Sequence, residues 1–206
     1  MEITQIKHAF RGPHTPRSQT RLIVIHHSDS HHVSAAEIHR WHLQRVPQWN
    51  GIGYHYVIGP EGTIETGRPH EVRGSHAGAA INGVSIGICL TGRFTQHRPT
   101  TAQMASLIWL IKHLQDIYGE LEITPHRDHT ATICPGPLFP WAELMKSLEE
   151  VKEVRFNTIA ELPDWARPTI QKLINQGALQ DTGTGFNLSE DMIRIFVIND
   201  RLGLYG

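Results

Sequence analysis

The 206-residue chain has little cysteine, little net charge and no long apolar run, and each shortage excludes a class of protein. Its two cysteines, Cys89 and Cys134, are too few for a disulfide scaffold. Lys and Arg (19) nearly balance Asp and Glu (20), unlike the basic excess of proteins that neutralise nucleic-acid phosphates. No apolar stretch reaches the roughly 18–20 residues that span a bilayer. We therefore expect neither a nucleic-acid partner nor insertion into a membrane.

Histidine is the residue present in excess. All 15 histidines lie between His8 and His129, and none follows. Such an excess indicates metal or proton chemistry, and its distribution places that chemistry in the part of the chain before residue 135.

Short β-branched runs alternate with amphipathic helices over residues 1–150. Strands are predicted at residues 21–27, 53–58, 63–67, 84–91 and 121–125, and helices at residues 34–45, 100–119 and 140–154. Ser34 with Glu37, and Thr100 with Gln103, have the spacing of capping boxes at helix starts. The second and third strands read as a hairpin. The pattern predicts an α/β fold with a central mixed β-sheet flanked by helices.

Residues 156–206 are predicted to form a small helical hairpin of their own. Pro163 and Asp164 are expected to open its first helix, which ends at Gly177, and Ser189 is expected to cap the second. The segment holds no cluster of titratable residues suited to catalysis. We interpret it as a binding or assembly module attached to a catalytic domain at residues 1–150.

Candidate metal ligands follow two of the predicted strands. His26 stands at the carboxyl end of the first strand, where open α/β sheets place their ligands. The loop at 125–137 follows the last strand and carries His126, His129 and Cys134. One histidine from the strand, with a histidine and the cysteine from the loop, would leave a fourth position for water, as in catalytic zinc sites. Spacing alone does not choose between the two loop histidines.

Two other interpretations of Cys134 stay open on these residues alone. It is an inert buried thiol beside surface histidines, or it is a nucleophile with His126 as its base. The nucleophile predicts sensitivity to alkylation and indifference to chelators. That interpretation lacks a third, orienting group and leaves His26 without a role.

Five motifs stand in order between residues 20 and 150. They are Ile25-His26-His27-Ser28, Gly53-Tyr54-His55-Tyr56, Gly74-Ser75-His76-Ala77, Ser85-Ile86-Gly87-Ile88-Cys89-Leu90, and His126-Arg127-Asp128 followed by Cys134-Pro135-Gly136. Together they resemble the type 2 N-acetylmuramoyl-L-alanine amidases, which include phage endolysins and animal peptidoglycan recognition proteins. The resemblance implies a mixed sheet flanked by helices. It also implies a zinc enzyme that cuts the amide between the lactyl group of muramic acid and L-alanine.

Carried over residue by residue, the resemblance implies one zinc ion bound by His26, His126 and Cys134. It places Tyr54 close to the zinc-bound water. It places Thr132 where some phage members have lysine and active recognition proteins have threonine. Both residues are therefore expected to be catalytic.

For the substrate, the muramyl peptide of peptidoglycan, the resemblance implies contacts from Trp49, His76 and Asn82. The alternative is a non-catalytic peptidoglycan-binding protein on the same fold. The presence of both Cys134 and Tyr54 favours the enzyme.

The C-terminal module resembles a single S-layer-homology-like repeat. The resemblance rests on Leu162-Pro163-Asp164-Trp165-Ala166 and Gly185-Phe186-Asn187-Leu188-Ser189. It implies binding to a secondary cell-wall polymer, whereas the plain alternative is a helical pair that packs on the amidase or on another copy of it.

The N-terminal residues lack the apolar segment of a signal peptide. We therefore expect a phage or prophage endolysin that is synthesised in the cytoplasm. It would act on the bacterial cell wall after release and lyse the cell.

Overall fold

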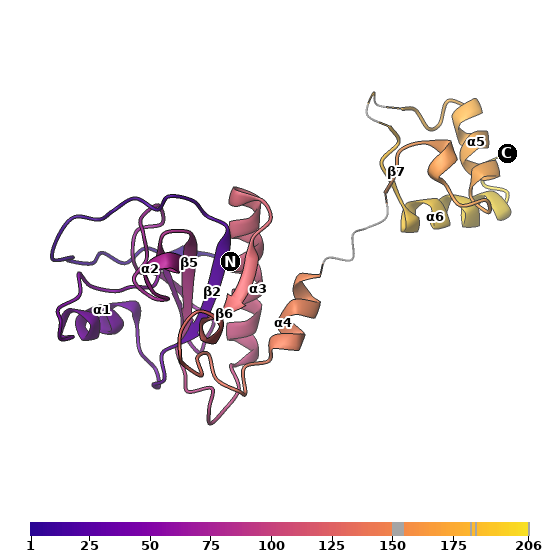
Figure 1. Cartoon of the computed structure of the whole chain (residues 1–206). Helices are drawn as coiled ribbons and strands as arrows, with labels where there is room; N and C mark the ends of the chain where they lie inside the picture. The colour runs from indigo at the N-terminus through magenta and orange to yellow at the C-terminus, as the bar shows by residue number, and fades with distance from the viewer. Residues whose placement is uncertain (150–154, 182, 184, 206) are drawn as a thin grey trace. The chain divides into compact units, whose positions relative to one another are not determined.

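The computed structural model describes residues 1–149, 155–181, 183 and 185–205. The chain divides into two compact units, Met1–Leu148 and Glu149–Gly206, which are described separately (Figure 1). The sequence placed the two domains at residues 1–150 and 156–206.

The larger unit is built on a six-stranded mixed sheet with strand order β1-β4-β3-β5-β2-β6. The strands are β1 (Ile3–Thr4), β2 (Leu22–His27), β3 (Tyr56–Ile58), β4 (Ile64–Thr66), β5 (Ser85–Leu90) and β6 (Glu122–Pro125). Strands β3, β5, β2 and β6 run parallel, and β4 pairs antiparallel with β3. The mixed sheet and its hairpin are therefore confirmed.

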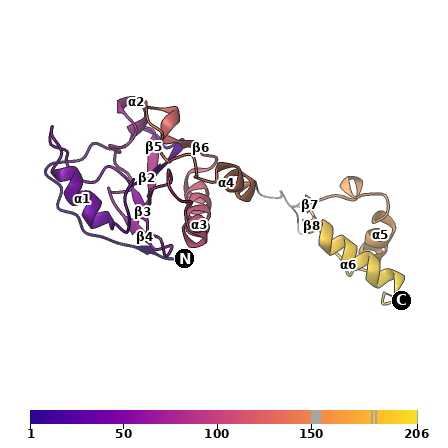
Figure 2. The ribbon, with the colours of Figure 1, turned by 90° about the horizontal axis from the view of Figure 1, so that it is seen from below.

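Helices cover both faces of this sheet. They are α1 (Ala35–Leu43), α2 (Ala79–Asn82), α3 (Thr101–Tyr118) and α4 (Trp141–Leu148), with a 3-10 turn, η1, at His126–Asp128. Capping boxes at Ser34 and Thr100 begin α1 and α3, as predicted. Figures 1 and 2 show α1 and α3 on opposite sides of the sheet. Among the described residues, no helix is long and apolar enough to cross a membrane.

The main core lies between the sheet and α3. Ile23 and Ile25 of β2 are fully buried there against Leu107 and Leu110 of α3. Successive side chains of a strand point to opposite faces, so His26 points to the other face, toward α1. A smaller apolar cluster under α1 occupies that face. The site's histidine is thus held by a strand that is buried on both sides.

Within the described residues, the start of β3 differs from the prediction, and two short elements were not predicted. Residues 53 and 54 do not continue β3, because the carbonyl groups of Gly53 and Tyr54 accept hydrogen bonds from Ser75 and Arg68 instead. The two-residue β1 and four-residue α2 are too short for a periodic pattern to reveal. Residues 150–154 of the predicted 140–154 helix lie outside the described residues.

The smaller unit has its own apolar core. Its elements are β7 (Arg155–Phe156), η2 (Ile159–Glu161), α5 (Arg167–Asn175), β8 (Leu188–Ser189) and α6 (Glu190–Arg201). The two helices are confirmed, and the Ser189 side chain caps α6 by accepting from the Met192 backbone. The first helix begins at Arg167 rather than near Pro163, because Pro163 forms a turn whose carbonyl accepts from the Ala166 amide.

Candidate metal centre

The register of two neighbouring strands places His26 and His126 side by side. Strands β2 and β6 are parallel, and Ile25 pairs with Pro125. The residue after Ile25 is His26, within β2, and the residue after Pro125 is His126, which begins η1, so both stand at the carboxyl edge of the sheet. Their ring centroids lie 4.4 Å apart.

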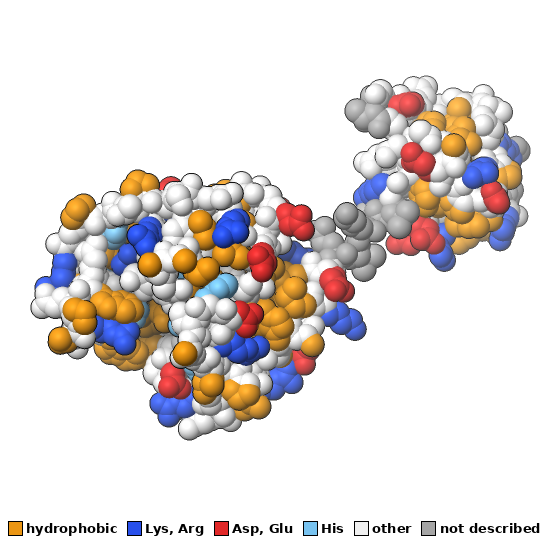
Figure 3. Space-filling view, viewed as in Figure 1, with side chains coloured by type: hydrophobic (Ala, Val, Ile, Leu, Met, Phe, Trp, Pro, Cys, Tyr) orange, Lys and Arg blue, Asp and Glu red, His pale blue; other side chains and the backbone are white. Residues whose placement is uncertain are grey.

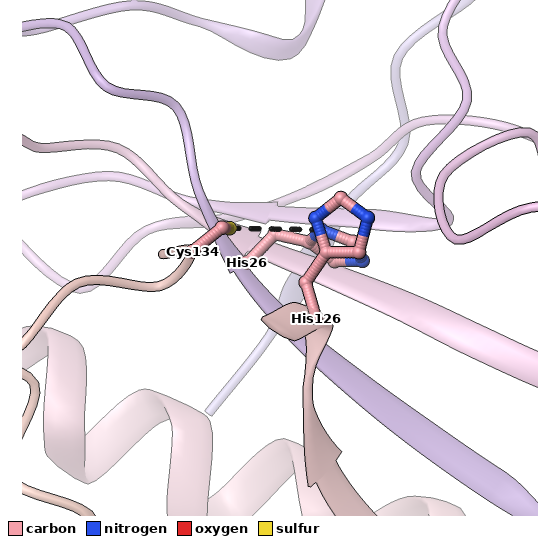
Figure 4. Close-up of side chains that lie close together, drawn as sticks. All are labelled: His26, His126 and Cys134. Atoms are coloured by element: carbon pink, nitrogen blue, oxygen red, sulfur yellow. Dashed lines mark hydrogen bonds between the residues drawn. The ribbon is translucent and has the colours of Figure 1, made fainter. Parts of the chain in front are cut away.

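The loop after β6 brings a thiol to the same point. The amide of Arg127 donates to the carbonyl of Cys134 at 2.9 Å, which closes the loop. One ring nitrogen from each of His26 and His126 and the Sγ atom of Cys134 all lie within 4.8 Å of one another. Figure 4 shows the three side chains pointing toward one another. These atoms form a possible metal site with two imidazole donors and one sulfur donor.

Both imidazoles also contact neighbouring side chains through their ring nitrogens. Nε2 of His26 lies 3.0 Å from Nδ1 of His76, and Nδ1 of His26 lies 3.9 Å from Sγ of Cys134. Nε2 of His126 contacts the Thr130 hydroxyl at 2.8 Å. Burial and neighbouring histidines hold the pKa of His26 well below its usual value. The ring is therefore neutral, which is the form that binds a metal.

The environment of Cys134 suits a metal ligand better than a nucleophile. Burial raises the pKa of its thiol to about 12. A cysteine nucleophile needs a lowered thiol pKa, whereas a metal ion deprotonates a coordinating thiol outright. Neutral imidazoles and a thiolate are donors that zinc takes, so the donor set fits a zinc ion.

Two neighbouring histidines do not join the group. Nε2 of His129 bonds to the Thr124 hydroxyl at 2.7 Å. Nδ1 of His27 accepts from the Phe94 amide at 3.2 Å. Spacing alone left His126 and His129 equivalent, and the structure separates them.

An open pocket of ≈ 780 Å³ adjoins these donors. Its lining residues are His27, Asp29, Arg45, Tyr54, Arg93, Thr95, His126, Thr132, Ile133 and Cys134. The Tyr54 ring lies 4.9 Å from that of His26, between centroids. Burial raises the pKa of Tyr54 well above its usual value, so its hydroxyl keeps its proton and can donate. The Thr132 hydroxyl accepts from the Cys134 amide at 3.2 Å and retains its own proton for donation.

The three predicted substrate residues have other partners in the structure. Trp49 lies beneath the guanidinium of Arg45, which is 4.5 Å from its ring centroid. His76 is buried, and the side-chain oxygen of Asn82 accepts from the amides of His76 and Ala77 at 2.9 and 2.8 Å. None of the three is among the described residues that line the pocket. Their contact with substrate stays a prediction.

The sequence did not reveal the charged residues Asp29, Arg45 and Arg93 that line the pocket. Arg93 pairs with Asp29 at 3.1 Å, and Arg45 stands on Trp49. Arginines in loops have no pattern that distinguishes a pocket wall from ordinary solvated charge, so the sequence offered no usable signal.

A family model described as N-acetylmuramoyl-L-alanine amidase matches residues 16–137, which contain all three candidate ligands. The chain belongs to this amidase family. It is therefore an enzyme, an N-acetylmuramoyl-L-alanine amidase, and its smaller unit lies outside the matched residues.

Named relatives of this amidase include phage and bacterial enzymes. The endolysin of Enterobacteria phage T3 is 36% identical over 129 residues, which cover 59% of this chain and 83% of that endolysin. The structure of N-acetylmuramoyl-L-alanine amidase LysC from Clostridium intestinale has a TM-score of 0.68 and 34% identity, and covers 72% of this chain and 97% of LysC.

An animal relative has been solved with a ligand. The Drosophila peptidoglycan recognition protein PGRP-LB, in complex with tracheal cytotoxin, has a TM-score of 0.55 and 27% identity. The match covers 65% of this amidase and 88% of that protein.

Half-buried His42 and buried His55 also hold the backbone that supports Tyr54. Nδ1 of His42 accepts from the Gly53 amide at 3.0 Å, and Nδ1 of His55 accepts from the Gly87 amide at 3.0 Å. Burial lowers the pKa of His42 to about 4 and that of His55 to about 3. Both rings must stay neutral to accept these bonds.

Stability of the amidase should therefore fall on mild acidification. The unfolded chain binds protons at an ordinary histidine pKa of 6.5, before the folded chain does. Stabilisation is complete above pH 6.5 and is lost as the pH falls toward 4 for His42 and 3 for His55, by up to about 1.4 kcal/mol per pH unit for each ring. His42→Asn keeps an acceptor and cannot titrate, so urea unfolding between pH 7 and 5 should show a shallower loss. An unchanged slope would contradict the role given to His42.

Proposed function

We propose that this amidase is zinc-dependent. It hydrolyses the amide bond between the lactyl group of muramic acid and L-alanine of the peptidoglycan stem peptide. The observation that carries the proposal is the convergence of His26, His126 and Cys134 beside an open pocket. The family match indicates which class of bond is cleaved, and the donor set indicates which metal is bound.

One zinc ion would be held by His26, His126 and Cys134. When bound, it would act as a Lewis acid toward the scissile carbonyl and would lower the pKa of water, so that water can lose a proton and attack near neutral pH. The burial of His26 keeps its imidazole neutral and available to the ion at physiological pH.

Two hydroxyl-bearing side chains line the pocket in which, in this proposal, negative charge would develop. Tyr54 and Thr132 both line the pocket beside Cys134. As the carbonyl carbon becomes tetrahedral, its oxygen gains charge, and a hydroxyl proton directed at that oxygen stabilises it. Tyr54 keeps its proton because burial raises its pKa. We assign both side chains to stabilisation of the oxyanion.

The substrate we assign is the muramyl peptide. The Drosophila relative in complex with tracheal cytotoxin supports this choice. Trp49 lies beneath the guanidinium of Arg45, which lines the pocket, and stays a predicted substrate contact. His76 and Asn82 stay predicted substrate contacts.

The biological role that fits these assignments is that of a phage or prophage endolysin. The similarity to the phage T3 endolysin supports it. The enzyme would act on the bacterial cell wall after release from the cell that made it, with bacteriolysis as the result.

We assign the smaller unit to a secondary cell-wall polymer, as a single S-layer-homology-like repeat. Trp165 is 43% exposed there, and Figure 3 shows hydrophobic side chains at the surface of this unit. Trp165 lines an open hollow of ≈ 380 Å³ together with Arg194, Val197, Ile198 and Arg201. An indole can stack on a sugar face, and guanidinium groups bind anionic substituents.

Substitution at the metal centre should separate metal binding from catalysis. Cys134→Ser removes the thiolate, so both zinc retention and hydrolysis of a soluble muramyl peptide should be lost. Tyr54→Phe should retain zinc and lose roughly 10²–10³-fold in kcat, the effect of removing one oxyanion donor. Zinc content by atomic absorption and release of L-alanine amino termini give the two readouts. Full activity of a metal-free Cys134→Ser protein would refute the metal assignment.

Substitution in the smaller unit should separate wall binding from catalysis. Trp165→Ala should weaken co-sedimentation with polymer-bearing cell walls by about tenfold, the effect of losing an aromatic anchor. Hydrolysis of a soluble muramyl peptide should not change. Met192→Ala, which removes an exposed apolar side chain of α6, is the matched control and should bind walls normally. Equal loss of binding and hydrolysis in Trp165→Ala would favour a packing role.

A further inference from the structure

His76 is a buried histidine that contacts a proposed metal ligand from outside the ligand set. Its exposed fraction is 8%, and that of His26 is 0%. We propose that His76 is a positioning residue for the metal centre. It accepts a hydrogen bond from Nε2 of His26 and so fixes the tautomer in which Nδ1 of His26 is free to bind the ion. This inference rests on the zinc-dependent function proposed above.

The contact between the two rings admits only two arrangements. Nε2 of His26 and Nδ1 of His76 are 3.0 Å apart, and the ring planes are nearly perpendicular at 88°. Between two neutral imidazoles, one nitrogen must donate and the other must accept. If His26 donates, its Nδ1 carries a lone pair toward Cys134. If His26 accepts, its Nδ1 carries a proton there and cannot bind a metal.

The far end of the hydrogen-bond chain decides between these arrangements. The Ser85 hydroxyl donates to the carbonyl of Ile81 at 2.7 Å. Its single proton is thereby used, so toward Nε2 of His76, 3.4 Å away, Ser85 can only accept. Nε2 of His76 must then hold the proton and donate. Nδ1 of the same ring is left as an acceptor for His26.

The direction of the chain is thus set by a backbone carbonyl. A carbonyl oxygen can only accept, so the order of donation runs from His26 to His76, to Ser85 and finally to Ile81. Each side chain in the order is buried. Reversal would give up the 2.7 Å bond from Ser85 to the Ile81 carbonyl for a 3.4 Å contact with His76, and would leave that carbonyl to the Gly83 and Val84 amides. The fold therefore selects the metal-binding tautomer of His26 before any ion arrives.

The packing around His76 keeps the ring in place. A Cβ atom at Gly74 would lie 2.7 Å from Nε2 of His76, and one at Gly87 would lie 2.7 Å from its Cδ2. Neither glycine has room for a side chain, so the ring fits closely between two backbone segments. The Asn82 side chain fixes the His76 backbone by accepting from its amide. This close fit explains why Gly74 and Gly87 stand in the motifs that flank the ring.

The test measures zinc affinity, with substitutions that separate the acceptor from the bulk of the ring. His76→Leu has no acceptor, and His76→Asn retains an oxygen at the position of Nδ1. In competition with a chromophoric chelator, His76→Leu should weaken zinc binding by about 10–100-fold, as for loss of other hydrogen-bond partners of metal ligands. His76→Asn should stay close to the unmodified enzyme.

His39→Leu is the matched control. His39 is also buried, accepts from the Ile52 amide and contacts the Ala9 carbonyl, so its loss costs comparable packing and hydrogen bonds. It does not contact the proposed ligands. The zinc affinity of this variant should therefore match that of the unmodified enzyme, although its stability should fall.

The tautomer can also be read directly, which keeps the inference testable if His76→Leu does not fold. Long-range ¹H–¹⁵N NMR of the full-length enzyme should show the His76 proton on Nε2 and an unprotonated Nδ1. A proton on Nδ1 of His76 would overturn the inference. So would unchanged zinc affinity in His76→Leu, or equal weakening in His76→Leu and His76→Asn. Failure of the unmodified chain to bind zinc would instead overturn the proposed function, and the inference with it.

Discussion

The pairing of β2 with β6 is the constraint on which the site depends. Because Ile25 stands opposite Pro125, His26 within β2 and His126 directly after β6 lie at the same level. A register shift by one residue would turn one of these side chains to the other face of the sheet. The apolar core against α3 fixes the register through fully buried Ile23 and Ile25. The candidate metal centre therefore depends on how the hydrophobic core packs.

The excess of histidine has two separate physical causes. His26 and His126 each offer a ring nitrogen to the candidate metal centre. His27, His39, His42 and His55 each accept a hydrogen bond from a backbone amide through Nδ1. A buried imidazole is a rigid neutral acceptor, and burial lowers its pKa so that it stays neutral at physiological pH. A neutral imidazole can therefore either bind a metal or accept a hydrogen bond from the backbone of a loop.

Local signals in the sequence predicted most of the elements but not their irregular connections. Ser34 and Thr100 correctly predicted the starts of their helices, because a capping box joins residues only three positions apart and is visible in the sequence. The extent of β3 could not be predicted, because the carbonyl groups of Gly53 and Tyr54 bond to segments distant in the chain. The ligand set was implied by motif resemblance, since spacing left two loop histidines equivalent. The contact of His76 with His26 joins residues 50 positions apart, so no local or periodic sequence pattern predicts it.

In the proposed function, a metal held by His26, His126 and Cys134 drives cleavage of the lactyl–L-alanine amide. The most direct test treats purified peptidoglycan with the enzyme before chelation, after chelation and after zinc is restored. We predict that turbidity falls, stops falling with chelator and falls again with zinc, and that each active phase releases new L-alanine amino termini. Undiminished hydrolysis by fully metal-free enzyme, or new termini other than L-alanine, would contradict the proposed function.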